Sequence, residues 1–239
     1  MHHLGSTRSA HERNHLLETP ETFVRAPLPG MQRATAIVHI SPALGARFVQ
    51  YTAEVEADGA LGPAGDQRFV YVTSGTLRVG DATLEPGDYA YLPPASGTRV
   101  SAITEARCTV FEKPYQNRAG VDAPEPLIGH ERRVTPSHLG DDPWLEVRAL
   151  VPDNPGFDFR VNTMTYQPGA ALAAPEIHVM EHGLLMLEGG GIYRLGDRWY
   201  PVQAGDVIWM SAYCPQWFGA LGKTPAKYLI YKDWDRHPG

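Results

Sequence analysis

Cysteine is scarce in this sequence. The 239 residues include only Cys108 and Cys214, and no C-x-x-C pair. This scarcity excludes a disulfide framework. A chain of this length can bury enough apolar surface to fold without such cross-links. We therefore expect both cysteines to be reduced and buried in the apolar runs that contain them.

Long apolar runs and blocks of positive charge are also missing. No 18 apolar residues run together, and the first 15 residues lack the apolar segment of a secretory signal, which argues against a membrane span and against export. The net charge is −6 without a basic run, so nucleic acid and anionic membranes are poor partners. We expect a cytoplasmic enzyme or binding protein.

Glycine and proline, by contrast, are plentiful. The chain has 24 Gly and 21 Pro, and they separate short runs rich in Val, Ile, Tyr and Phe. Turn signals recur about every 8–12 residues, a spacing typical of an all-β sandwich or barrel and unlike that of βαβ units.

Two parts of the sequence resemble each other. The run "RFVYVTSGTLRVGDATLEPGDYAYLPP" (68–94) aligns with "HGLLMLEGGGIYRLGDRWYPVQAGDVIWMSA" (182–212). Each has an apolar run, a Gly-led turn at Gly75 or Gly189, a hairpin, and "PGD" or "AGD" before another apolar run. We interpret the chain as two copies of one β unit. The predicted parts are a flexible tail (1–20), a first copy (21–121), a connection (122–142) and a second copy (143–239).

Potential metal ligands gather in the stretch "PEIHVMEHG" (175–183) of the second copy. As a helix, its "HVMEH" is the H-x-x-E-H pattern of a zinc protease. However, Pro175 and Gly183 bracket only seven residues, and an isolated helix that short is marginal. As strands, Glu176 and His178 point to one face, and a turn at 179–181 would let His182 face back toward His178.

The glycines around this stretch follow the framework of a cupin motif, with six residues where cupins have five between Gly169 and the first ligand position, Glu176. Gly169 and Gly189 flank it, and Gln216 follows Gly205 by eleven residues, where cupins place their last histidine. The sequence thus resembles cupins, with Glu for the first His, His for the Glu, and Gln for the final His. This resemblance implies two tandem double-stranded β-helix (jelly-roll) barrels, a bicupin. The first copy has no ligand at the corresponding places, which are Ala64, Arg68 and Thr98.

The unusual ligand types narrow the resemblance further. The run from "FDFRVNTMTYQPG" through "EIHVMEHGLLMLEGGGIYRLG" to "KYLIYKDWDRHP" closely resembles the C-terminal half of (S)-ureidoglycine aminohydrolases, manganese bicupins of purine (allantoin) degradation. The resemblance implies one Mn²⁺ per chain, in the second cupin, held by Glu176, His178, His182 and Gln216. It also implies that the substrate pocket contains Tyr193, Tyr228 and Lys232.

The chemistry of these residues agrees with that function. A carboxylate, two imidazoles and an amide oxygen suit Mn²⁺ better than a closed structural zinc site. Hydrolysis of a ureido-amino acid to ureidoglycolate and ammonia needs proton transfer, and Lys232, one of four lysines against 17 arginines, can deprotonate when desolvated. We expect a small anionic substrate, Lys232 as the catalytic residue, and a homo-oligomer, since bicupins commonly associate.

Other interpretations of these residues remain open. Taken alone, Gln216 could be a strand-edge amide, Tyr193 and Tyr228 could only pack, and Lys232 could be a solvated edge lysine. The alternatives at the level of function are a non-catalytic cupin that binds a small ligand such as glyoxylate for regulation, and a cupin isomerase or dioxygenase.

Overall fold

A computed structural model describes residues 7–233. These residues form two compact units. The first barrel contains 24–134 and 153–158, and the second barrel contains 7–23, 135–152 and 159–233. The described residues form strands and four short 3-10 helices but no α-helix, so the predicted all-β class is confirmed. No helix within 7–233 is long and apolar enough to cross a membrane.

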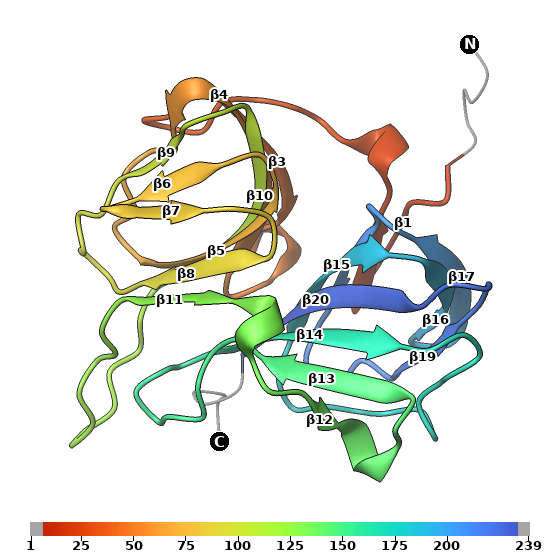
Figure 1. Cartoon of the computed structure of the whole chain (residues 1–239). Coiled ribbons are helices and arrows are strands. Elements are labelled where there is room, and N and C mark those ends of the chain that lie inside the picture. The colour runs from red at the N-terminus through yellow and green to blue at the C-terminus, as the bar shows by residue number, and fades with distance from the viewer. Residues whose placement is uncertain (1–6, 234–239) are drawn as a thin grey trace. The chain divides into compact units, whose positions relative to one another are not determined.

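The first barrel is built on one curled sheet. Within the described residues the sheet has nine strands, in the order β11-β8-β5-β10-β4-β9-β6-β7 with β3 paired to β4 (Figure 1). The elements are β3 (Gln32–Ile40), η2 (Pro42–Leu44), β4 (Val49–Ala60), β5 (Gln67–Ser74), β6 (Leu77–Val79), β7 (Ala82–Leu84), β8 (Asp88–Leu92), β9 (Val100–Ala102), β10 (Ala106–Lys113), β11 (Leu127–His130) and η3 (Glu131–Arg133).

The second barrel has two sheets. Among the described residues, one has eight strands in the order β1-β2-β18-β15-β20-β14-β13-β12, and the other has three, β17-β16-β19. The elements are β1 (Ala10–Glu12), β2 (His15–Glu18), η1 (Pro20–Thr22), β12 (Ser137–His138), η4 (Leu139–Asp141), β13 (Leu145–Ala149), β14 (Arg160–Tyr166), β15 (His182–Glu188), β16 (Gly190–Leu195), β17 (Arg198–Gln203), β18 (Val207–Met210), β19 (Gln216–Ala220) and β20 (Ala226–Lys232).

Each barrel has its own apolar interior, because alternate residues of its strands point inward. The core of the first barrel is rich in small aliphatic side chains, such as Val70, Val72 and Val110. The core of the second is bulkier and contains Tyr166, Tyr193, Phe218 and Tyr228. The two interiors therefore differ in chemistry although their strands are arranged alike.

The strand pairing repeats in detail. In the first barrel, β5 pairs with β10 and the register shifts as it skips Thr73. In the second, β15 pairs with β20 and the register shifts as it skips Leu187. These two positions are equivalent in the sequence alignment of the copies (73 to 187), and β-bulges are specific features of a fold. The same irregularity at the same place agrees with two copies of one unit.

The Gly-led turn that marks each copy has a steric reason. Gly75 and Gly189 have φ of 72° and 64°. A Cβ at Gly75 would lie 2.0 Å from the carbonyl oxygen of Glu105, and one at Gly189 would lie 2.5 Å from that of Pro225. Only glycine fits both the left-handed backbone and the close strand.

The start of the chain differs from the predicted flexible tail. Residues 10–12 and 15–18 form the hairpin β1–β2, and β2 pairs with β18 of the second barrel. Alternation explains this, because His15 and Leu17 are buried while Leu16 and Glu18 are less so. The prediction of a tail over 1–20 is therefore wrong for the hairpin residues. Residues 1–6 lie outside the described part.

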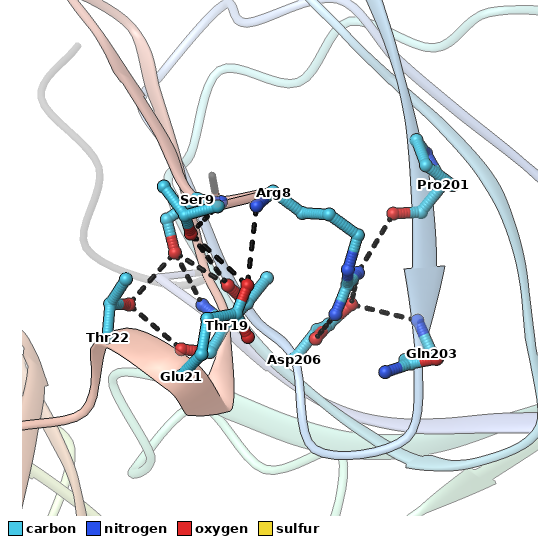
Figure 2. Close-up of polar contacts among 9 residues, drawn as sticks. Arg8, Ser9, Thr19, Glu21, Thr22, Pro201, Gln203 and Asp206 are labelled. Atoms are coloured by element: carbon cyan, nitrogen blue, oxygen red, sulfur yellow. Dashed lines mark hydrogen bonds and ion pairs between the residues drawn. The ribbon is translucent and has the colours of Figure 1, made fainter. Parts of the chain in front are cut away.

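Polar contacts fix this hairpin to the second barrel (Figure 2). Arg8 donates two hydrogen bonds to the fully buried carboxylate of Asp206, at 2.6 and 2.8 Å, and a third to the carbonyl of Pro201. Ser9 hydrogen-bonds to the hydroxyls of Thr19 and Thr22. Bidentate Arg–carboxylate pairs are among the stronger polar contacts, and this one attaches the start of the chain to the loop before β18.

The predicted connection at 122–142 is divided between the units. Its strand β11 pairs with β8 of the first barrel, and its strand β12 pairs with β13 of the second. The boundary between units falls at 134/135, and residues 153–158 return to the first barrel. Composition alone marked this stretch as polar and Pro-containing, but it did not reveal which strands its two ends would join.

Candidate active site

The stretch 175–183 is extended and bent, as the strand interpretation predicted. Glu176 forms an isolated antiparallel bridge with Gln216, with N–H···O distances of 2.8 and 2.9 Å in the two directions. After bends at 179–180, His182 opens β15. The helical protease interpretation is thereby excluded.

A backbone contact holds the segment that carries His178. The N–H of Tyr213 donates to the carbonyl of His178 at 2.7 Å. Tyr213 has φ of 62°, a conformation uncommon for residues other than glycine. Together with the Glu176–Gln216 bridge, this contact joins two segments that are far apart in the sequence.

All seven residues predicted for the site line one cavity of the second barrel. Its volume is about 390 Å³, and the seven are Glu176, His178, His182, Tyr193, Gln216, Tyr228 and Lys232. The rest of the lining is apolar, with side chains such as Leu139, Leu172 and Ile230. An apolar cavity with a few convergent polar groups is the usual form of a small-molecule site.

The sheet accounts for the grouping of His182 and Lys232. They face each other across β15 and β20, and directly opposed residues of an antiparallel pair lie on the same face. Burial lowers the pKa of His182 well below its ordinary value, and the charges of Lys232 and His178 lower it further. A neutral imidazole is the form that binds metal.

Lys232 lies in the same cavity, and its surroundings favour loss of its proton. Burial lowers the pKa of its ammonium, and the nearby carboxylate of Glu176 opposes that shift. The lysine can therefore lose its proton more readily than a solvated one. This behaviour fits a proton-transfer group better than the solvated edge lysine that the sequence left open.

The candidate metal donors also contact one another. His178 Nε2 lies 3.1 Å from Glu176 Oε2, and the rings of His178 and His182 are 5.1 Å apart. Within residues 7–233, no group of three or more His, Cys, Asp or Glu side chains is placed to hold a metal ion as the side chains stand. The cavity gathers the four donors, and their role as metal ligands stays a prediction.

Tyr193 touches a predicted metal ligand. Its hydroxyl donates to Gln216 Oε1 at 3.3 Å, and both side chains are buried. This contact orients the amide with its oxygen toward Tyr193. A carbonyl oxygen has two lone pairs, so Gln216 can accept this hydrogen bond and still bind a cation.

Two residues in or near the site were missed or misjudged. Tyr166 is fully buried, and its hydroxyl lies 2.9 Å from that of Tyr228. No local signal marked it, because its partner Tyr228 lies 62 positions away in the sequence. Glu181 belongs to the turn predicted at 179–181, but it is only 6% exposed and accepts a hydrogen bond from Trp209 Nε1 at 3.0 Å. Nothing in the local sequence indicates that Trp209 folds over it.

Comparisons with known proteins show which family the chain belongs to. Residues 162–231 match the cupin domain family. The chain is 40% identical over 245 residues to the (S)-ureidoglycine aminohydrolase of Arabidopsis thaliana, an alignment that covers 98% of this chain and 80% of that protein. The chain belongs to the (S)-ureidoglycine aminohydrolase family. The family resemblance inferred from the sequence is confirmed.

Solved structures give the same bicupin fold for this aminohydrolase-family chain. The protein Ylba from Escherichia coli superposes with a TM-score of 0.85 at 30% identity, covering 99% of this chain and 98% of that one. A glyoxylate-induced protein from Pseudomonas aeruginosa superposes with a TM-score of 0.87 at 28% identity, covering 98% and 94%. The predicted cupin architecture is confirmed.

Proposed function

We propose that this protein hydrolyses (S)-ureidoglycine to (S)-ureidoglycolate and ammonia in the cytoplasm, as a homo-oligomer, at a Mn²⁺ site in the second barrel. The observation that carries the proposal is the cavity of the second barrel. Seven residues selected from the sequence as ligands or pocket residues, from positions 176 to 232, all line it. The identity of the substrate is inferred from the relatives, which are named (S)-ureidoglycine aminohydrolases.

The donor set fits the proposed ion. Glu176, His178, His182 and Gln216 would supply one carboxylate, two imidazoles and one amide oxygen, which suits Mn²⁺. When bound, the ion supplies positive charge and Lewis acidity for an anionic substrate. His182, kept neutral by burial, has a lone pair available for it. Glu176 contributes the one negative charge among the four.

Lys232 would carry the proton. Replacing the amine of ureidoglycine by a hydroxyl breaks one C–N bond and forms one C–O bond. The incoming water must lose a proton, and the departing amine must gain one. With its pKa lowered by burial, the Lys232 amine can accept a proton from water and deliver it to the amine, so protons balance over the cycle.

The decisive experiment is release of ammonia from freshly generated ureidoglycine. The purified chain is stripped of metal, reloaded with Mn²⁺ or left without, and compared at equal protein concentration. We expect stereospecific ammonia release above the uncatalysed rate only with metal. Metal-loaded protein that binds the substrate but releases no additional ammonia would contradict the proposal and favour the non-catalytic binding function.

A further inference from the structure

Tyr166 is a buried tyrosine next to the cavity that neither the sequence nor the cavity lining singled out. It lies on β14, which pairs with β20 beside it (Figure 1). Its ring packs edge-on against Phe218, with centroids 4.9 Å apart, and none of its side chain is exposed. Its hydroxyl lies 2.9 Å from that of Tyr228, which does line the cavity.

The hydrogen bonds of these two phenols can be assigned by counting protons. Burial raises the pKa of both Tyr166 and Tyr228 above the ordinary value, so each hydroxyl keeps its single proton. Within residues 7–233, the Tyr166 hydroxyl makes one hydrogen bond, the one to Tyr228. If Tyr228 donated in that bond, the Tyr166 proton would be buried without an acceptor, which is unfavourable. Tyr166 therefore donates, and Tyr228 accepts.

This assignment leaves the proton of Tyr228 to be donated elsewhere. Among residues 7–233, the other hydrogen bond of the Tyr228 hydroxyl is to the sulfur of Met164, at 3.3 Å. A thioether is a weak acceptor, and Met164 itself lines the cavity. An oxygen of a ligand in the cavity would be the better acceptor. Because Tyr228 already accepts from Tyr166, the two bonds polarise in series and the second is strengthened.

We propose that Tyr166 is a positioning residue that fixes Tyr228 as a hydrogen-bond donor toward a carboxylate or carbonyl oxygen of the substrate. The identity of that substrate rests on the proposed function. Tyr166 touches no substrate itself, and it acts through the direction in which Tyr228 donates. The site would accordingly favour ligands that present an acceptor to β20.

The first barrel provides an independent comparison. On its pair β4–β10, Cys108 faces Ala53 and Ala106 faces Val55. On β14–β20 of the second barrel, Tyr228 faces Met164 and Ala226 faces Tyr166. The residues that correspond to Tyr166, Met164 and Tyr228 are therefore Val55, Ala53 and Cys108. These three side chains cannot form a relay, by which we mean two hydrogen bonds in series through a pair of hydroxyl groups. The relay occurs in the barrel with the candidate ligands and is missing at the matching positions of the other.

The test is a double-mutant cycle on the Mn²⁺-loaded full chain with Tyr166→Phe, Tyr228→Phe and the pair together. Two quantities are measured, kcat and KM for ammonia release, and the Kd of N-carbamoylglycine by calorimetry. N-carbamoylglycine is the substrate without its leaving amine, so its binding does not depend on turnover. Tyr166→Phe should raise KM and Kd by about three- to tenfold with kcat within about threefold. The double variant should be no worse than Tyr228→Phe alone.

A matched control separates positioning from stability. Tyr51 is a buried tyrosine of the first barrel whose hydroxyl donates to Glu112 at 2.9 Å. Tyr51→Phe deletes the same atom and should lower the melting temperature without changing Kd. Each of three results would overturn the proposal. The first is that the effects of Tyr166→Phe and Tyr228→Phe on Kd are additive, and the second is that Tyr166→Phe leaves Kd unchanged. The third is that the wild type does not bind N-carbamoylglycine. Wild-type binding without turnover would instead reject the proposed function, and the cycle would still be measurable by Kd.

Discussion

The two barrels carry different residues at equivalent positions of their corresponding sheets. In the second, His182 faces Lys232 across β15 and β20. In the first, Arg68 faces Glu112 across β5 and β10. Arg68 donates to Glu112 at 2.7 Å and to the carbonyl of Gly62 at 3.0 Å. In the first barrel this position holds an ion pair whose arginine is also hydrogen-bonded to a backbone carbonyl. In the second barrel it holds His182 and Lys232, which line a cavity and whose pKa values are both lowered by burial.

The difference shows what a duplicated fold holds constant. Strand pairing, the bulge and the Gly-led turn recur in both barrels because the backbone hydrogen bonds require them. The inward side chains at a given position can serve packing or chemistry as long as the interior stays filled. A barrel can therefore lose or gain a site without changing its register. The predictions below test that separation.

The largest effect is expected from His182→Ala, which removes a predicted ligand. Mn²⁺ retained after dialysis should fall, and ammonia release should drop by about 10⁴ or more, because both the metal's Lewis acidity and its hold on the substrate are lost. Metal analysis and the ammonia assay measure the two effects. The matched substitution Arg68→Ala in the first barrel should leave kcat within about twofold per folded molecule. Equal losses from both would show that the first barrel also contributes to catalysis.

Lys232→Met should separate proton transfer from binding. Removing the amine should lower kcat by about 10²–10⁴. The Mn²⁺ content and the Kd of N-carbamoylglycine should change little, because the ligand donors remain. A variant that binds substrate and releases ammonia at the wild-type rate would remove Lys232 from the mechanism.

Tyr193→Phe tests whether this residue serves the metal or the substrate. Because its hydroxyl contacts Gln216, we expect Mn²⁺ affinity to weaken by about tenfold or more, with KM nearly unchanged at saturating Mn²⁺. A titration of Mn²⁺ against activity measures the first quantity. A raised KM with unaltered metal affinity would instead support the direct substrate contact that the family resemblance implies.

The smallest effect should be on stability alone. Arg68→Met leaves the Glu112 carboxylate, whose side chain is 23% exposed, with Tyr51 as its remaining donor. We expect a loss of about 1–3 kcal/mol in the free energy of unfolding, measured by urea and far-UV circular dichroism, with kcat retained. An unchanged urea midpoint would show that water replaces the arginine fully.

Much of the fold and the site was readable from local pattern. Alternation and Gly-led turns gave the strands, and the same spacing appearing twice gave two barrels. Glu176, His178 and His182 lie within seven residues, so their parity was enough to bring them to one site. The hairpin at 10–18 was missed because most of its residues are polar, and its burial depends on the pairing of β2 with β18, which is far away in the sequence.

The sequence by itself determined the all-β class, the duplication and the kinds of candidate ligand in the second copy, because these depend on periodicity and on residue type. Only the tertiary structure decided that Glu181 is buried against Trp209, that Tyr193 contacts Gln216 and that the hydroxyls of Tyr166 and Tyr228 lie within hydrogen-bond distance. Those are contacts between strands distant in the chain. Their partners are set by the register of the sheets, which no local pattern specifies.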